Sequence, residues 1–142
     1  MPLKGFNSLC KERQKEIVSR DKGSQIKHIA INQDEKKVTH YKIDGEVIKT
    51  GLRCDFLLMN EEEESRTAYL IELKGSDLLH AVEQLKSTKT LLEEQLKNYT
   101  VHFRIVLNRI STHDSMNKDF RKFQEINKGR VVYKTKILEE KI

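Results

Sequence analysis

One short apolar segment constrains the fold of this chain more than any other part of its sequence. Residues 68–74 read AYLIELK, so two charged residues, Glu72 and Lys74, lie at the end of an apolar run. Side chains on a β-strand alternate between its two faces, which puts Ile71 and Leu73 on one face and Glu72 and Lys74 on the other. Burying charge is costly unless the charge is paired or binds a metal ion. The segment therefore predicts a buried strand whose end carries a charged group with a partner.

A second apolar run, residues 53–59, comes shortly before and carries Asp55 near its start. The acidic run 61–64 between the two predicts a solvated hairpin tip, and neighbouring strands would bring Asp55 close to Glu72 and Lys74. The acid-x-Lys spacing alone says little, because 35% of the residues are charged and the spacing occurs four times. Only at Glu72 does it lie inside an apolar segment, and this position carries the inference.

Length and composition narrow the class of protein. A chain of 142 residues fits one domain, and the hydrophobic fraction of 37% describes a rather polar protein. No apolar run approaches the ~20 residues of a membrane helix, and the N-terminus lacks the apolar stretch of a signal peptide. Cys10 and Cys54 form no metal-binding or disulfide pattern. We expect a cytoplasmic protein without a membrane partner, and its net charge of +5 is compatible with a polyanionic ligand.

The hydrophobic periodicity predicts the element order α-β-β-β-β-α-β-α-β in one α/β (α+β) domain. We expect a first helix over 6–20, strands over 26–31, 38–43, 53–59 and 67–74, a long helix capped by Ser76 or Asp77, a strand over 101–107, a helix over 116–126 and a final strand over 131–138. Gly129 is a candidate helix stop. The expected architecture is a central mixed β-sheet flanked by helices.

The predicted site suits metal-dependent attack on a phosphodiester. Mg²⁺ or Mn²⁺ prefers oxygen ligands, which Asp55, Glu72 and the backbone carbonyl of Leu73 could supply. Lys74, on the same face as Glu72, could orient the attacking water or stabilise the developing charge. The alternative is an ion pair among the same residues that only neutralises itself.

These residues resemble the motif of the PD-(D/E)xK nuclease superfamily, which includes restriction endonucleases and Holliday-junction resolvases. The similarity runs through Arg53-Cys54-Asp55, Glu72-Leu73-Lys74 and Glu83-Gln84-Leu85. The expected αβββαβ order over residues 6–108 is similar as well. The resemblance implies a restriction-endonuclease-like fold with an αβββαβ core.

The resemblance also implies a role for each matched residue. Asp55 and Glu72 would be metal ligands, Lys74 the catalytic lysine and Gln84 a supporting residue on the following helix. Many members add an acid from the first helix, and here Glu12 and Glu16 both qualify. We prefer Glu16 because it lies closer to the apolar stripe. The chain departs from the motif at Cys54, where the proline that names it would stand.

By resemblance the substrate is nucleic acid, with DNA favoured over RNA, and a homodimer or a partner protein would help to set substrate geometry. Basic residues that could contact phosphates without reading sequence are Lys86, Lys89, Lys97, Arg121, Lys122, Arg130, Lys134 and Lys136. Two other interpretations stay open. One is a catalytically inactive member of the same fold that serves as a nucleic-acid-binding or assembly subunit. The other is an unrelated α/β interaction protein with a fortuitous motif.

Overall fold

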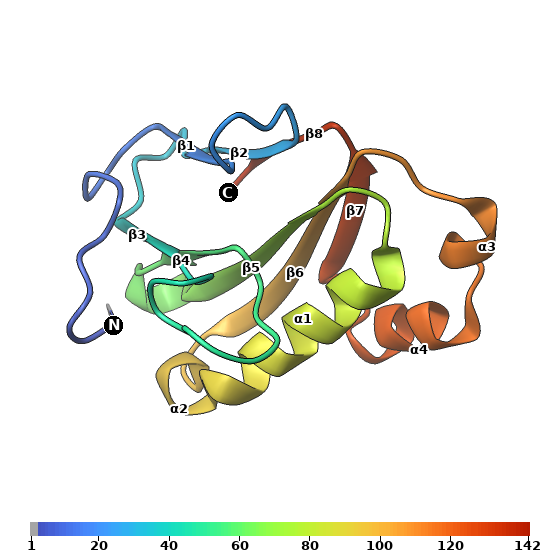
Figure 1. The fold of residues 1–142 in the computed structure, drawn as a ribbon. Coiled ribbons are helices and arrows are strands. Elements are labelled where there is room, and N and C mark those ends of the chain that lie inside the picture. Colours follow the sequence, from blue (N-terminus) through green and yellow to red (C-terminus); the bar gives the residue numbers. More distant parts are fainter. Residues whose placement is uncertain (1–2) are drawn as a thin grey trace.

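The computed structural model describes residues 3–142, which form two β-sheets and a layer of helices (Figure 1). The larger sheet has the strand order β3-β4-β5-β6-β7 and the smaller one the order β1-β2-β8. The strands are β1 (Glu16–Ser19), β2 (Lys27–Ile31), β3 (Val38–Lys42), β4 (Phe56–Asn60), β5 (Thr67–Lys74), β6 (Thr100–Leu107), β7 (Val131–Thr135) and β8 (Ile137–Lys141). The helices are α1 (Leu78–Leu91), α2 (Glu93–Leu96), α3 (Thr112–Ser115) and α4 (Lys118–Ile126), with a short 3-10 turn, η1 (Glu63–Ser65).

The larger sheet is mixed, and three of its strands end at the same edge. Strands β3, β4 and β5 are antiparallel neighbours, whereas β5, β6 and β7 run parallel. Parallel neighbours need a crossover, and α1 and α4 lie in the two crossovers on one face of the sheet (Figure 1). We call the edge where these three strands end, at Lys74, Leu107 and Thr135, the carboxyl edge.

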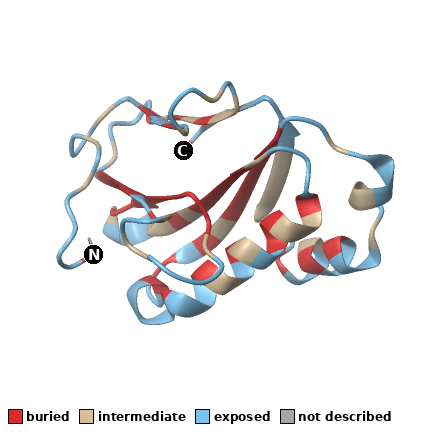
Figure 2. Cartoon of the chain, viewed as in Figure 1, coloured by how far each residue is buried: buried red, intermediate tan, exposed pale blue. Residues whose placement is uncertain are grey.

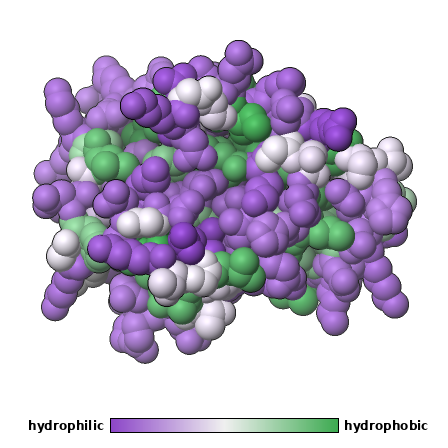
Figure 3. All heavy atoms as spheres, viewed as in Figure 1, coloured by the Kyte–Doolittle hydropathy of each residue, from purple (hydrophilic) through white to green (hydrophobic). Residues whose placement is uncertain are grey.

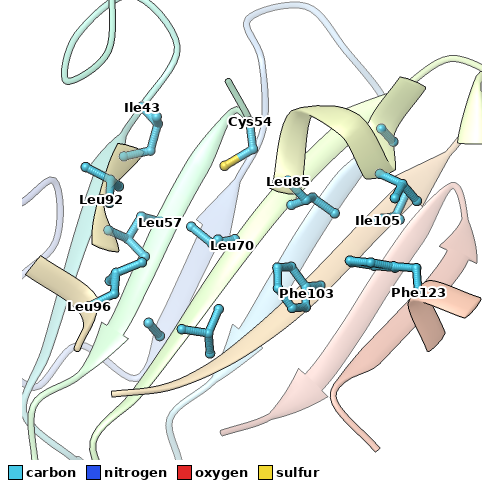
Figure 4. Close-up of a cluster of buried hydrophobic side chains, with 14 of the residues drawn as sticks. Ile43, Cys54, Leu57, Leu70, Leu85, Leu92, Leu96, Phe103, Ile105 and Phe123 are labelled. Carbon is cyan, nitrogen blue, oxygen red and sulfur yellow. The ribbon is translucent and has the colours of Figure 1, made fainter. Parts of the chain in front are cut away.

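Two apolar clusters, one on each face of the larger sheet, hold the layers together. Between the sheet and the helices, Leu57, Leu70 and Phe103 pack with Leu85 and other buried side chains (Figure 4). On the opposite face, Ile71, Val106 and Phe56 pack against Ala30 and Leu138 of the smaller sheet. Burial is therefore concentrated in the strands and on the inner faces of the helices (Figure 2).

The helix signals in the sequence correspond to real caps. The Asp77 side chain accepts a hydrogen bond from the backbone nitrogen of His80 and starts α1, as predicted. Asn117 caps α4 in the same way, and Phe120 and Phe123 face the core. Strand β5 has the predicted bounds, and the other interior strands lie within a few residues of those predicted. The mixed α/β class is thus confirmed.

The predicted first helix is wrong, because residues 6–20 contain no helix and instead end in strand β1. The preceding segment runs along the outer edge of β3, where the Leu9 nitrogen donates to the His40 oxygen at 2.7 Å. The Val38 nitrogen donates to the Glu12 oxygen, also at 2.7 Å. These long-range bonds cover an otherwise open sheet edge, which a free helix could not do. The initial α of the expected αβββαβ order is therefore absent.

Two further expectations about the sheet need correction. The predicted strand 131–138 divides at Lys136, whose positive φ of 68° sends the chain from β7 in the larger sheet to β8 in the smaller one. Helices cover only one face of the larger sheet, and the smaller sheet covers the other. The expected arrangement of a sheet flanked by helices is thus correct for one face only.

The outer surface is mainly hydrophilic, and on the face in Figure 3 apolar side chains form small separate patches. Within residues 3–142, no helix has both the length and the apolar character needed to cross a membrane.

A buried ionic cluster joins the two sheets. Glu140 of β8 accepts hydrogen bonds from Arg104 Nε at 2.7 Å and pairs with His28 Nε2 at 2.6 Å. The Arg104 guanidinium lies 5.3 Å from the centre of the Tyr69 ring. Burial alone would raise the pKa of Glu140, but its bonds to His28 and Arg104 outweigh burial and lower that pKa to about 2. Ionised Glu140 is therefore part of the interface between the sheets.

We expect Glu140→Gln to lower the free energy of unfolding by about 3 kcal/mol, because Arg104 would keep its buried charge without a carboxylate. Since the folded-state pKa lies below the unfolded value near 4.5, the stabilisation by Glu140 is present above pH 4.5. It is lost as the pH falls towards about 2. Urea unfolding between pH 2 and pH 7 measures both effects. Glu139→Gln, at the exposed neighbouring position, is the control and should change little.

Candidate functional site

The pairing of β4 with β5 brings two carboxyl groups together at the end of the sheet. The ladder ends where Phe56 pairs with Ile71, and just beyond it the Asp55 nitrogen donates to the Ile71 oxygen at 3.1 Å. The Asp55 and Glu72 side chains meet there through a hydrogen bond. Asp55 is 7% exposed and Glu72 is 1% exposed. The structure thus places the two predicted metal ligands side by side.

The two carboxyl groups differ in how their oxygens are satisfied. Asp55 Oδ2 accepts a hydrogen bond from the backbone nitrogen of Leu73 at 2.8 Å, which holds it against the end of β5. Glu72 Oε1 is buried and has no hydrogen-bond partner within the described residues. A buried oxygen without a donor is costly in a folded protein and is a position at which a cation would be favourable.

The pKa values of both carboxyl groups are raised by their burial. Burial, and then the charge of Asp55, raise the pKa of Glu72 to about 9 from an ordinary value of 4.5. Burial is also the main reason that the pKa of Asp55 rises to about 6. The two carboxyls interact through a hydrogen bond, so without a cation Glu72 keeps its proton near neutral pH. The pair is held together in a form that a divalent ion would deprotonate.

Lys74 ends β5 on the same face as Glu72 and is half-buried. Its positive charge acts to lower the pKa of Glu72, but burial and Asp55 outweigh this effect. The lysine is therefore close enough to influence the carboxyl pair, and no salt bridge between Lys74 and either acid is found among residues 3–142 with N–O separations up to 4.0 Å. The predicted self-neutralising ion pair is not the arrangement observed.

Helix α1 holds the chain segment that leads into Asp55. Gln84 Nε2 donates to the Arg53 oxygen at 3.0 Å, and Thr88 Oγ1 accepts from the Cys54 nitrogen at 2.7 Å. Ser87 Oγ donates to the Leu52 oxygen at 2.6 Å. Gln84 thus contacts the backbone two residues before Asp55, and its supporting role in the site stays a prediction. The sequence carried no signal for Ser87 and Thr88, because their partners lie more than 30 positions away.

Gln84 and Cys54 also bear on which atoms can act as ligands. Gln84 Oε1 is buried and, among the described residues, lacks a hydrogen-bond partner. Cys54 Sγ points into the apolar core (Figure 4), and burial raises the pKa of its thiol well above the usual range. The thiol therefore stays neutral, which disfavours it as a nucleophile or metal ligand. The available donors around Asp55 are oxygen atoms.

This donor set fits Mg²⁺ or Mn²⁺. Across residues 3–142 there is no cluster of three or more His, Cys, Asp or Glu side chains arranged to hold a metal ion. A hard cation bound by two carboxylates, a carbonyl oxygen, water and substrate phosphate needs no such cluster. The carbonyl of Leu73, between Glu72 and Lys74, remains the third candidate ligand by its position in the strand.

The predicted acid from a first helix is wrong, and another acid is close to the pair. Glu16 and Glu12 are exposed, Glu16 in β1 and Glu12 in the segment before it. Asp21, in the turn after β1, acts to raise the pKa of both Asp55 and Glu72. The sequence around Asp21 did not predict this position, because the pairing of the smaller sheet determines where the turn lies.

The basic residues predicted to contact phosphates are spread over the molecule. Helix α1 starts at the carboxyl edge and runs back across the sheet for 14 residues, about 20 Å. Lys89, Lys97 and Arg130 therefore gather towards the opposite end, where they line a cavity of about 470 Å³. The other basic residues predicted to contact phosphates lie elsewhere on the molecule. Lys86 lies 3.8 Å from Glu83, Arg121 and Lys122 are exposed on α4, Lys134 is exposed on β7, and Lys136 follows β7 at the carboxyl edge.

We expect the metal-free protein to lose stability as the pH rises from 4.5 towards 9. The folded state keeps the Glu72 proton in this range and the unfolded chain does not. Glu72→Gln should remove much of this slope and raise the free energy of unfolding at pH 8 by up to about 5 kcal/mol, since each of the roughly 3.5 pH units above 4.5 contributes up to about 1.4 kcal/mol. Thermal unfolding in EDTA from pH 5 to pH 9 tests this. Glu83→Gln, an exposed position on α1, should keep the wild-type slope.

Comparison with known proteins adds no relative to this geometry. Neither the family models, nor the curated proteins, nor the solved structures searched gave a match to this chain. Conclusions about function therefore depend on the carboxyl pair and its surroundings.

Proposed function

We propose that this protein is a metal-dependent nuclease, similar to the PD-(D/E)xK nucleases, that hydrolyses phosphodiester bonds in DNA. The observation that carries the proposal is the buried pair of contacting acids Asp55 and Glu72, with Glu72 Oε1 lacking a donor among the described residues and Lys74 on the same strand face as Glu72. A structural ion pair would satisfy its own atoms. This pair instead holds two acids together at a cost in stability, which is typical of a cation site.

The arrangement of elements around the pair supports the proposal. Strands β3, β4 and β5, helix α1 and strand β6 follow one another in the βββαβ order that the resemblance implies. Asp55 precedes the second of these strands and Glu72 and Lys74 end the third, as in the motif. We infer a restriction-endonuclease-like core in which the N-terminal segment and β1 stand in place of the first helix.

A bound Mg²⁺ or Mn²⁺ would supply positive charge to the attacking water and to the phosphate oxygens. The chain would then act through four groups. Asp55, fixed by the Leu73 nitrogen, and Glu72 would lose their shared proton and hold the cation. The Lys74 ammonium would orient the water, which attacks phosphorus as the bond to the leaving oxygen breaks and that oxygen takes a proton. Gln84 would keep Asp55 in place through the Arg53 carbonyl.

We expect cleavage of linear, supercoiled, branched or single-stranded DNA in Mg²⁺ or Mn²⁺ and none in EDTA. Glu72→Gln and Lys74→Met should each lower the rate at least about 100-fold, the loss typical when one group that stabilises the transition state is removed. Lys128→Met, an exposed position in the turn before β7, should cleave at the wild-type rate. RNA is tested in parallel.

The pattern of results separates the alternatives. Binding of DNA without cleavage in any metal would contradict the nuclease and favour a catalytically inactive binding or assembly subunit. Equal cleavage by wild type and both variants would show that Glu72 and Lys74 are not part of the site.

Metal binding has its own expected signature, independent of activity. Millimolar Mg²⁺ or Mn²⁺ should raise the Tm of the wild type at pH 7.5, because the ion binds the folded carboxylates and not the unfolded chain. The rise should disappear in Glu72→Gln and persist in Glu83→Gln, which carries the same change of charge at an exposed position. Equal rises in all three proteins would place the metal elsewhere.

A further inference from the structure

Lys136 has a backbone conformation that lysine rarely adopts. It links β7 to β8 with a φ of 68°, and the only other described non-glycine residue with a positive φ is Glu35. Such a conformation is unfavourable for a side chain with a Cβ and easy for glycine. The backbone bonds at this position do not need a lysine, because they join the Lys136 nitrogen to the Leu107 oxygen and the Lys136 oxygen to the Lys27 nitrogen. What a lysine adds at this position, compared with a glycine, is therefore its side chain.

The Lys136 side chain is held over the carboxyl edge by one neutral partner. Its Nζ donates to Asn108 Oδ1 at 3.0 Å, and Lys136 is exposed. Asn108 is itself fixed to the end of β5, because its nitrogen donates to the Gly75 oxygen at 2.7 Å and lies 3.3 Å from the Lys74 oxygen. Within residues 3–142, no carboxylate pairs with Lys136 at salt-bridge distance. The ammonium is thus positioned and its charge is uncompensated.

Lys136 also lies two strands away from the end of β5, the strand that carries Glu72 and Lys74. Lys74 pairs with Leu107, Leu107 pairs with Thr135, and Lys136 is the next residue. Two strand spacings of about 4.8 Å separate the ends of β5 and β7, or about 10 Å. Successive phosphates of one DNA strand rise by about 3.4 Å along the duplex axis and also rotate around it, so they lie about 7 Å apart in space. The separation of the two strand ends therefore corresponds to one or two phosphates.

We propose that Lys136 binds a backbone phosphate of the nucleic acid, one or two positions from the phosphate held at Asp55 and Glu72. The position of the second phosphate rests on the proposed function, whereas phosphate binding by Lys136 does not. Asn108 is the positioning residue for the ammonium, and the positive φ of Lys136 brings its side chain to the edge instead of into the next strand. The contact involves phosphate only, so it sets the path of the strand without reading bases.

The test is the salt dependence of DNA binding in EDTA, where no cleavage can occur. A fluorescent duplex is titrated with wild type, Lys136→Gln and Lys136→Gly, and binding is followed by anisotropy from 50 to 200 mM salt. Loss of one phosphate contact should reduce the slope of log K against log salt by about 0.9 for a duplex. Both variants should show this loss, and Lys128→Gln, with the same change of charge at the opposite end of the sheet, should keep the wild-type slope.

Thermal unfolding shows whether the lysine is needed for folding. Lys136→Gly should keep or raise the wild-type Tm, because glycine adopts the positive φ more easily. A wild-type slope in Lys136→Gln, or no binding of DNA by the wild type, would overturn the proposal. If both variants lose slope while no protein cleaves DNA, the phosphate contact stands and the proposed nuclease fails.

If the wild type cleaves DNA, neutral methylphosphonates at single positions locate the contact. A neutral group one or two phosphates from the cut should weaken binding to wild type and leave binding to Lys136→Gln unchanged. An equal effect on both proteins at every position would show that Lys136 contacts none of these phosphates.

Discussion

The antiparallel pairing of β4 with β5 ends with Phe56 opposite Ile71, and the chain just before it brings the Asp55 side chain into contact with Glu72. A shift of one residue in this register would move the apolar side chains of β4 to the opposite face. The register is held from both sides, because Leu57 and Leu70 pack under the helices while Phe56 and Ile71 pack under the smaller sheet. The packing that makes the core thus also forces two acids together in a place with little water.

This juxtaposition is unfavourable for the isolated chain and explains the features around it. Burial raises the pKa of both carboxyls, the charge of Asp55 raises the pKa of Glu72 further, and one carboxyl oxygen has no donor among the described residues. Helix α1 holds the chain that leads into Asp55 through Gln84, Ser87 and Thr88, which bond to the backbone of residues 52–54. A rigid surrounding that maintains an unfavourable pair is what a preorganised cation site requires.

The smaller sheet does more than cover the apolar face of the larger one. Its strands start or turn beside the carboxyl edge, which brings Asp21 near the acids and leaves Lys136 at the end of β7. The buried cluster of Arg104, Glu140 and His28 fixes this sheet in place. Charges on both sheets therefore meet at one edge, although they come from opposite ends of the chain.

The sequence by itself determined the parts that depend on neighbouring residues. Strand β5, the hairpin that joins it to β4, and the capped start of α1 follow from alternation, periodicity and side-chain capping, and these place Asp55, Glu72, Lys74 and Gln84. The site was predictable to this extent because it lies within one short stretch of chain.

Only the tertiary structure decided what depends on distant partners. Residues 6–20 have helical periodicity but cover the edge of β3, since its open hydrogen bonds are stronger constraints than local propensity. Glu61, predicted to be solvated, is buried and accepts a hydrogen bond from Thr39 at 2.8 Å. The division of 131–138 at Lys136, and with it the placing of Asp21, follows from pairing between β2 and β8. Such long-range pairing leaves no pattern in the local sequence, because its free energy comes from residues that meet only in the folded chain.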